Sequence, residues 1–416
     1  MDPAGFLPGT AGLETPEQYL PSPFALMYIF CMFKKMTDPF TVEGKQIIIA
    51  VSNDLLVDQR VHRIACTLVE MGAAPLLVGR KLPGSRGISK RPYHIHRMRL
   101  LFRKGPLFYA CYNVRLFFFL LFRKADMLVS NDLDTLPACY TVARIKNLPL
   151  VYDSHEYFTE VPELIGRTFT RNIWEGIEKM ILPRIKYSYT VCRSVADAYK
   201  EKYGIRMEVI RNLPVREKAE ARRPDLLECD PKSIIIYQGA LNVGRGLENI
   251  IAAMQYLDDC YLQIFGDGDI AGKLAGLRKA LNVEDRVKFM GRLPFQELKA
   301  YTRQASLGIS LEEDLGLNYR YALPNKLFDY IHARVPVLVS GLPEMRKVVE
   351  DYEIGQILKD TDPEMLAKQV REMIDSDELR MKWKKNLRKA AAELCWEKEE
   401  EKLRALYRKS LNLNLT

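Results

Sequence analysis

Two short stretches in the second half of the chain place a cation where a bound anion would stabilise it. The first, YQGALNVGRGLENI (237–250), begins with the last residues of an apolar run, which ends at Gly239. Its Arg245 lies between Gly244 and Gly246. Glycines let backbone N–H groups approach a phosphate closely, and the arginine fork adds further donors. The alternative for this stretch alone is an ordinary strand-to-helix loop that carries a surface arginine.

The second stretch, LPNKLFDY (323–330), has the pattern of a helix start. Pro324 favours the first turn, which puts Asn325 and Lys326 at the N-terminal end. That end already carries positive potential, so a lysine is unfavourable there unless an anion is bound. Asp329, almost one turn further on, can accept hydrogen bonds from a ribose diol. A solvated Lys–Asp pair would explain this stretch alone, but the two stretches together predict a nucleotide diphosphate site.

Polar and ionisable side chains gather at the C-terminal ends of three apolar runs in the first half. They are Asn53, Asp58 and Arg60 after residues 46–52, Asp132 and Asp134 at the end of 126–132, and Asp153 and His155 at the end of 148–154. Ligands of parallel sheets bind outside such strand ends, so we expect these residues on one wall of a cleft. The flanking carboxylates make an acid–base role for His155 as reasonable as a structural one.

The sequence GDGDIAG (266–272) is compatible with two other kinds of site. A dinucleotide fingerprint requires an acidic residue at the end of the next strand, and that strand ends in KFMGR (288–292). A metal site would use Asp267 and Asp269, which fit a strand-to-helix turn equally well, and the cysteines lack zinc-type spacing. We therefore predict no NAD, no metal ion and no other cofactor.

Two sheets are needed to position these residues. Short apolar runs alternate with helical patterns over 46–192 and again over 233–340, which predicts parallel, doubly wound sheets. The predicted strands are 46–52, 75–80, 126–132, 148–154 and 187–192, then 233–239, 261–266, 286–291, 307–311 and 336–340. The fold class is α/β, with two Rossmann-like domains facing each other across a cleft and one ligand on each wall.

The expected boundaries follow from composition. Residues 211–233 are polar and charged and contain three prolines, as a linker does, and the tail is rich in Glu–Lys pairs at helical spacing. The expected segments are a poorly ordered leader (1–44), a first domain (45–212), a linker (213–232), a second domain (233–385) and a charged C-terminal helix (386–416).

The net charge of +9 is concentrated in one segment. Residues 71–125 contain twelve lysines and arginines and no acidic residue, interleaved with apolar runs such as LFFFLLF (116–122). A nucleic-acid surface would carry spaced aromatics among polar residues, so the pattern instead predicts contact with an anionic membrane surface. The alternative is a core helix with arginines at its rim. The predicted membrane contacts are Arg103, Lys104, Arg115, Phe117, Phe118 and Phe119.

Composition and the leader sequence indicate where in the cell the protein is found. The chain is 48% hydrophobic and 28% charged, as folded soluble proteins are, and its apolar runs are too short to span a bilayer. The leader has no basic region ahead of its apolar stretch, so we expect no signal peptide. Scattered cysteines indicate reduced thiols. These features predict a cytoplasmic protein that is peripheral on the inner face of the cytoplasmic membrane.

Taken in order, the motifs resemble those of a known enzyme family. VSNDLLVDQRVHR (51–63), VYDSHE (151–156), YQGALNVGRGLENII (237–251), VKFMGRL (287–293) and LPNKLFDYIHARVPVLVS (323–340) are similar to the family-4 retaining glycosyltransferases of the GT-B fold, the glycosyl transferases group 1. The resemblance runs from about residue 46 to residue 375. It implies an acceptor-side first domain and a nucleotide-sugar-binding second domain, acting without a metal ion.

The resemblance also implies roles for single residues. Arg245 and Lys326 would bind the donor diphosphate and stabilise it as the leaving group, Asp329 would bind the ribose, and His155 would lie beside the transferred sugar. The donor-binding set would be Gly239, Arg245, Gly246, Arg292, Leu293, Asn318, Asn325, Lys326 and Asp329. Arg292 and Leu293 would border the base. The acceptor-side set would be Asn53, Asp58, Arg60, Asp132, Asp134 and Asp153.

One position departs from the family pattern. The first acid of the paired motif, eight positions before Asp329, is here Tyr321, so LGLNY (315–319) would have to replace it. The implied function is retaining transfer of a sugar to a glycan or lipid-linked acceptor in cell-surface polysaccharide, lipopolysaccharide or glycoconjugate synthesis. The alternatives are a nucleotide-sugar epimerase of GT-B fold and a non-catalytic nucleotide-binding partner.

Overall fold

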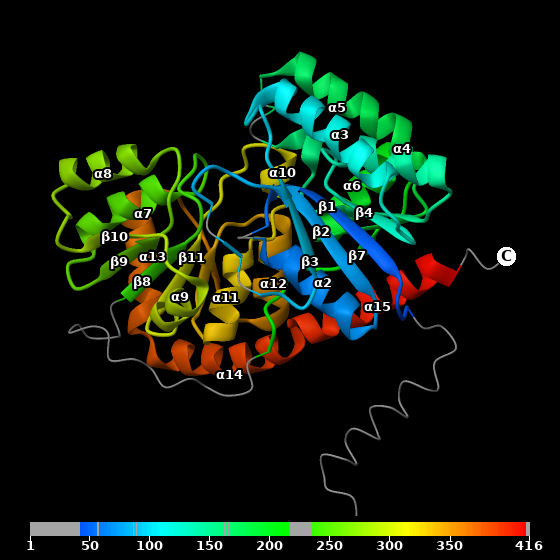
Figure 1. The fold of residues 1–416 in the computed structure, drawn as a ribbon. Helices are drawn as coiled ribbons and strands as arrows, with labels where there is room; N and C mark the ends of the chain where they lie inside the picture. Colours follow the sequence, from blue (N-terminus) through cyan, green and yellow to red (C-terminus); the bar gives the residue numbers. More distant parts are fainter. Residues whose placement is uncertain are drawn as a thin grey trace, which may run out of the picture. The chain divides into compact units, whose positions relative to one another are not determined.

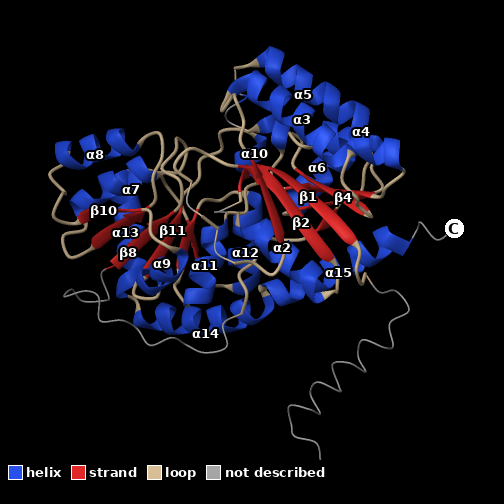
Figure 2. Ribbon diagram, viewed as in Figure 1, coloured by secondary structure: helices blue, strands red, loops and turns tan. Residues whose placement is uncertain are grey.

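The computed structural model describes residues 42–55, 58–85, 87–88, 90–161, 164, 166–216 and 234–412. The predicted leader therefore lies outside the described residues up to residue 41, and the predicted linker lies outside them from residue 217 onward. The described chain forms two parallel sheets flanked by helices (Figures 1 and 2).

The first sheet has seven strands in the order β3-β2-β1-β4-β5-β6-β7. Its strands are β1 (Gln46–Asp54), β2 (Ala74–Arg80), β3 (His94–Met98), β4 (Met127–Asn131), β5 (Leu150–Ser154), β6 (Tyr187–Thr190) and β7 (Glu208–Val209). Its helices are α2 (Gln59–Glu70), α3 (Gly105–Leu121), α4 (Leu136–Lys146), α5 (Thr168–Ile181) and α6 (Arg193–Tyr203). A crossover places β4 beside β1, so polar residues at the ends of β1, β4 and β5 share one edge.

The second sheet has six strands in the order β10-β9-β8-β11-β12-β13. Its strands are β8 (Ile234–Gln238), β9 (Tyr261–Phe265), β10 (Val287–Gly291), β11 (Leu307–Ser310), β12 (Val337–Val339) and β13 (Gly355–Ile357). The helices around it are α7 (Leu247–Ala253), α8 (Ala271–Ala280), α9 (Phe295–Thr302), α10 (Leu317–Arg320), α11 (Asn325–Ala333), α12 (Pro343–Tyr352), α13 (Pro363–Asp375) and α14 (Asp377–Glu393). The predicted fold class, α/β with two doubly wound sheets, is confirmed.

Strand β1 illustrates why its sequence is apolar throughout. Ile48 and Ala50 face one core, which α3, α4, α5 and α6 cover, whereas Ile47 and Ile49 face a second core on the opposite side of the sheet. A parallel strand covered on both faces has no polar side, which gives a continuous apolar run instead of alternation. All ten predicted strands are present, and β3, β7 and β13 were not predicted.

The last described helix, α15 (Trp396–Asn412), returns to the first sheet. Trp396, Leu403 and Tyr407 are buried in the same core as Ile47 and α2. Residue 386, where we expected the C-terminal helix to begin, lies inside α14. The charged tail is two helices because α14 ends at Glu393 and the chain turns before Trp396.

An ion pair at the start of α15 joins it to the segment after β7. The Glu399 carboxylate accepts from Arg211 Nε at 3.0 Å and Nη2 at 2.7 Å, and it is almost fully buried. Within the described ranges, no helix combines the length and apolar character that crossing a bilayer requires.

Candidate active site

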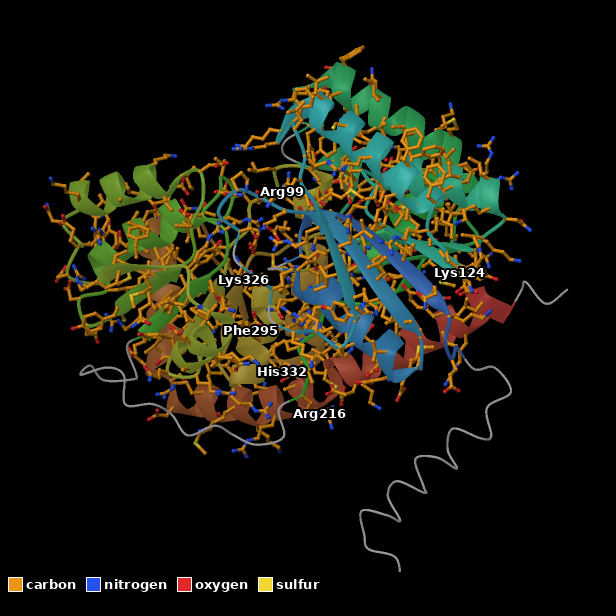
Figure 3. All side chains as sticks on the ribbon, in the orientation of Figure 1. Arg99, Lys124, Arg216, Phe295, Lys326 and His332 are labelled. Carbon is orange, nitrogen blue, oxygen red and sulfur yellow. The ribbon has the colours of Figure 1, made fainter. Side chains whose placement is uncertain are left out.

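A cleft of about 490 Å³ lies between the two sheets, outside the C-terminal ends of their strands. The predicted site residues that line it are Asp58, Arg60, His155, Gly239, Arg245, Asn318, Asn325 and Lys326. The first three come from the first domain and the others from the second, and Lys326 lies between the two sheets in Figure 3. The structure therefore brings both predicted phosphate-binding cations and His155 to one site.

The loop after β8 depends on two glycines. Gly239 has a φ of +145° and Gly246 a φ of +66°, both in the region that favours glycine. A Cβ on Gly246 would also meet the carbonyl oxygen of Leu311. The resulting turn directs Arg245 toward the cleft, with its guanidinium carbon 5.0 Å from the centre of the Tyr319 ring.

Both cations of the second sheet share a carboxylate that we did not predict. Glu312 Oε1 lies 2.7 Å from Lys326 Nζ and 3.5 Å from Arg245 Nη1, and Glu312 is almost fully buried. Burial alone would raise the pKa of Glu312, but Lys326, the Ser310 hydroxyl and Arg245 outweigh it and hold that pKa below its usual value. Glu312 is therefore ionised and fixes the two cations at the cleft wall.

The signal for Glu312 was present in the sequence. It directly follows β11, so the rule that selected acids at strand ends in the first sheet would also have selected it. Tyr321, which occupies the position of the family's first motif acid, lines the cleft, and its carbonyl accepts from the Cys192 thiol at 3.3 Å. Glu312 rather than residue 321 supplies a carboxylate beside the cations.

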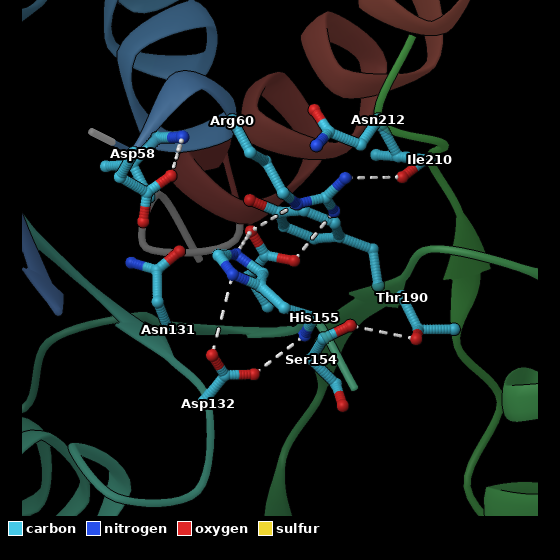
Figure 4. A network of polar contacts seen from close by, with 12 residues as sticks. Asp58, Arg60, Asn131, Asp132, Ser154, His155, Thr190, Ile210 and Asn212 are labelled. Atoms are coloured by element: carbon cyan, nitrogen blue, oxygen red, sulfur yellow. Dashed lines mark hydrogen bonds and ion pairs between the residues drawn. The ribbon is translucent and has the colours of Figure 1, made fainter. Parts of the chain in front are cut away.

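Figure 4 shows the polar network that holds His155. The ring bonds through Nε2 to Asp153 Oδ2 at 3.0 Å, and its Nδ1 lies 3.5 Å from Asp132 Oδ2. The backbone N–H of His155 donates to Asp132 Oδ1 at 2.7 Å. Arg60 Nη2 lies 2.8 Å from Asp153 Oδ1, and Arg60 Nη1 donates to the Ile210 carbonyl. The guanidinium of Arg60 is therefore buried and paired within the protein.

The electrostatics of this network fix the charge of His155. Burial alone would lower its pKa, but Asp132 and Asp153 raise it to about 10. Burial would raise the pKa of Asp153, and Arg60 and His155 instead bring it down to about 2. At neutral pH His155 is an imidazolium, which can donate a hydrogen bond or stabilise negative charge but cannot act as a general base.

Three predicted residues of the first domain have structural partners. Asp58 Oδ1 accepts the backbone N–H of Val61 at 3.0 Å and so caps α2. Arg60 and the buried Asp153 form an ion pair, and Asp153 also holds the His155 ring.

Three predicted donor-binding residues lie away from this cleft. The Asp329 carboxylate accepts from Gln238 Nε2 at 2.7 Å and lines a separate small pocket against α9. Burial raises the pKa of Asp329 to about 6. Arg292 is exposed, with Nε 4.0 Å from Asp267 Oδ2, and neither it nor Leu293 lines the cleft.

Asn53, Asp132 and Asp134 line a second cavity, of about 760 Å³, within the first domain. Glu156 lines this cavity and the cleft, so the two spaces adjoin. Burial raises the pKa of Asp132 and of Asp134 to about 6. Asp132 has a φ of +58°, a strained conformation for a non-glycine residue, which turns its carboxylate back toward His155.

The predicted membrane contacts divide by exposure. The exposed ones are Arg103, Lys104, Arg115 and Phe118. Phe117 and Phe119 are partly buried against the core, and Phe119 stacks on His96 with ring centroids 4.4 Å apart. Helix α5, which we did not select, also presents apolar residues to solvent: Phe169 is 79% and Met180 is 57% exposed.

In the part of the chain that the structure describes, no group of three or more His, Cys, Asp or Glu residues is placed to hold a metal ion. Asp267 Oδ1 accepts the backbone N–H of Gly268 at 2.9 Å, which is a contact within its own turn.

Comparison with known proteins identifies the family. The model for glycosyltransferase family 4 matches residues 57–213, and the model for glycosyl transferases group 1 matches residues 218–390. The chain belongs to the family-4 glycosyltransferases. Its reaction class is therefore glycosyl transfer from a nucleotide sugar, which agrees with a cleft lined by two phosphate-suited cations.

Individual proteins are similar to this chain in sequence or in fold. An alpha-D-kanosaminyltransferase from Streptomyces kanamyceticus is 25% identical over 264 residues, which are 59% of this chain and 67% of the relative. Sucrose-phosphate synthase from Thermosynechococcus elongatus has a TM-score of 0.72 at 18% identity, covering 88% of this chain and 98% of that one. WaaG, a glycosyltransferase involved in lipopolysaccharide biosynthesis, has a TM-score of 0.63 at 15% identity, covering 86% and 98%. The fold is GT-B.

Proposed function

We propose that this family-4 glycosyltransferase moves a sugar from a nucleotide diphosphate sugar to a glycan or lipid-linked acceptor, with retention of configuration and without a metal ion. The observation that carries the proposal is the convergence of Arg245, Lys326 and the His155 imidazolium in one cleft. Three cationic groups around one space suit a diphosphate leaving group, whose charge grows as the glycosidic bond breaks.

The proposed step conserves every atom. The acceptor oxygen bonds to C1 of the sugar on the face that the departing β-phosphate oxygen leaves, and the C1–O bond breaks with its electron pair going to the phosphate. The acceptor's proton passes to that phosphate oxygen. Arg245 and Lys326 stabilise the diphosphate, and the His155 imidazolium adds its positive charge beside the sugar. Glu312 keeps both cations in place.

The remaining donor contacts need one rearrangement. Asp329 is proposed to bind the ribose diol, and Arg292 and Leu293 to border the base. Because Asp329 now accepts from Gln238, ribose binding would exchange that hydrogen bond. Asn318, whose amide oxygen accepts from the backbone N–H of Tyr157 at 3.0 Å, would join the two domains around the donor.

We place this activity in cell-surface polysaccharide, lipopolysaccharide or glycoconjugate synthesis, on the inner face of the cytoplasmic membrane and without a nucleic-acid partner. Exposed apolar residues of α3, including Phe118 and Leu107, lie among Arg103, Lys104 and Arg115, which suits an anionic membrane surface. The lipopolysaccharide role of the structurally similar WaaG supports the same pathway class.

Thermal shift measurements with UDP, GDP, ADP and NAD test the donor site. A ligand at about 100 times its Kd stabilises a fold by roughly 2.7 kcal/mol. We expect one nucleoside diphosphate to raise Tm in the wild type and in Lys368→Ala, whose lysine is exposed on α13, but not in Lys326→Ala. A response to NAD alone, or equal responses in the two variants, would contradict the proposal.

Product analysis separates the alternatives. Slow release of free sugar from the matching donor, with the anomeric configuration preserved in the first product detected by NMR, is expected of a retaining transferase. Conversion to an epimer of the donor would identify an epimerase instead. Nucleotide binding without any turnover would identify a non-catalytic partner.

A further inference from the structure

The cavity that Asp134 lines has a buried carboxylate at its inner end and basic and apolar side chains at its outer end. It runs within the first domain between α3 and α5, and its inner end lies at the loops that follow β1 and β4. Glu156 joins this inner end to the nucleotide cleft, and the outer end opens near Arg103 and Lys104. A volume of about 760 Å³ is large enough for most of a drug-sized molecule.

At the inner end, a buried carboxylate oxygen has no partner. The Ser52 hydroxyl donates to Asp134 Oδ2, whereas Oδ1 has no hydrogen-bond partner, and Asp134 is only 6% exposed. Asn113 Nδ2 donates to the Asp134 carbonyl at 2.7 Å and so fixes the backbone. An unpaired buried oxygen is costly, and a hydroxyl group in the cavity would satisfy it.

The opening of the cavity is basic. Arg80 donates from Nη1 to the Arg103 carbonyl at 3.2 Å and stacks over Phe108, with its guanidinium carbon 4.7 Å from the ring centre. Its Nε is buried without a hydrogen-bond partner. Arg103, Lys104 and Arg167 are exposed around the same opening. A guanidinium with free donors among other cations is the chemistry that recognises a phosphate.

The outer wall is apolar and continues onto the surface. Trp174 of α5 packs edge-to-face on Tyr109 and on Phe158, in each case with ring centroids 5.2 Å apart. Two further apolar residues of α5 line the cavity: Ile173, next to Trp174, is 49% exposed, and Phe169, just over one turn before it, is 79% exposed. Apolar side chains that extend from a cavity to solvent suit a chain that is itself only partly enclosed.

We infer that this cavity binds the acceptor as a lipid phosphate: a hydroxyl at Asp134, a phosphate at Arg80 and Arg103, and a hydrocarbon chain along Trp174, Ile173 and Phe169. The inference rests on the proposed transferase function and specifies its acceptor. The order of the three zones matches a sugar joined through phosphate to a long apolar chain. It brings the acceptor hydroxyl to the Glu156 side, next to the donor cleft.

Fluorescence titration with farnesyl phosphate below its micelle concentration tests this inference. Trp174 is the tryptophan that lines the cavity, so binding should change its emission saturably, and the change should disappear in Trp174→Phe. Farnesol, which lacks the phosphate, should bind at least about tenfold more weakly because it forms no charge-assisted hydrogen bonds. Inorganic phosphate, which lacks the chain, should produce no change.

Two variants on one helix serve as a matched pair. Ile173→Glu places a charge on the apolar wall and should weaken farnesyl phosphate binding by about tenfold or more. Met180→Glu changes an equally exposed residue of α5 outside the cavity and should leave it unchanged. Equal binding by both variants, no response to farnesyl phosphate, or equal responses to farnesol and farnesyl phosphate would overturn the inference.

The thermal shift measurement with nucleoside diphosphates shows whether a negative result with farnesyl phosphate contradicts only this inference or also the proposed function. If a nucleoside diphosphate stabilises the protein through Lys326 while farnesyl phosphate does not bind, the transferase assignment stands and the lipid-phosphate acceptor is wrong. If neither binds, both are wrong.

Discussion

Replacement of Asp134 by asparagine should make the protein more stable and less active, and the gain in stability should depend on pH. The pKa of Asp134 is about 6 in the folded protein, against an ordinary value of 3.8. Between pH 3.8 and pH 6 the folded chain retains a proton on Asp134 that the unfolded chain has lost. The stability of the wild type therefore falls as the pH rises from 3.8 to 6 and stays reduced at higher pH. At about 1.4 kcal/mol per pH unit, the full penalty is about 3 kcal/mol.

Asparagine does not titrate, so the variant avoids this penalty. Urea unfolding should give Asp134→Asn an advantage of about 1 kcal/mol at pH 4.5 and about 3 kcal/mol at pH 7.5. Asp258→Asn, whose carboxylate is 91% exposed, should behave like the wild type at both values. An advantage that is equal at the two pH values, or larger at pH 4.5, would refute the reasoning.

Activity should change in the opposite direction. The variant loses a charged acceptor for the substrate hydroxyl, and a hydrogen bond to a charged group contributes roughly 1.5–3 kcal/mol. We therefore expect kcat/KM for the acceptor to fall about ten- to hundredfold with donor KM unchanged. Unchanged acceptor kinetics would separate Asp134 from acceptor binding while leaving the stability argument intact.

Three further changes test other parts of the structure. Glu399→Ala leaves the partly buried arginine of its ion pair uncompensated and should cost about 3 kcal/mol in urea unfolding, whereas the exposed Glu401→Ala should cost little. His155→Gln should be less stable than the wild type, most of all at pH 6.5 and progressively less as the pH rises toward 10. The reason is that a histidine pKa raised from 6.5 to about 10 stabilises the fold fully only below pH 6.5. A difference in free energy of unfolding that stays constant between pH 6.5 and 9 would contradict this prediction. Gly246→Ala forces a side chain into a φ of +66° and should cost about 1–3 kcal/mol, measured as a lower Tm, while Gly276→Ala, inside α8 with open space around it, should not destabilise.

The sequence predicted the elements that carry a strong local signal. Most of the predicted strands are covered on both faces and appear as uninterrupted apolar runs, and all ten are present, including the partly buried edge strand β10. Strand β3 (HIHRM) was missed because it is an edge strand with a half-exposed, polar composition. Glycine and proline positions predicted the turns after β8 and before α11, because these residues determine the backbone conformation at their own positions.

What the sequence could not supply is the orientation of side chains between elements. Asp329 was expected in the donor cleft, but its position on α11 turns it toward Gln238 and α9. The position of Glu312 after a strand was visible in the sequence, but its pairing with Lys326, at the start of α11, was not. The separation of the acceptor-side acids into a distinct cavity depends on how α3 and α5 pack, which a single sequence does not encode locally.

The return of α15 to the first sheet has a consequence for how the protein is made. Leu403 and Tyr407 complete the core behind β1, although the whole second sheet lies between them in chain order. On the ribosome, α2 can cover part of that face early, but the part beneath α15 stays exposed until the second sheet has been synthesised. The core of the first domain is therefore completed only after the second domain has been made.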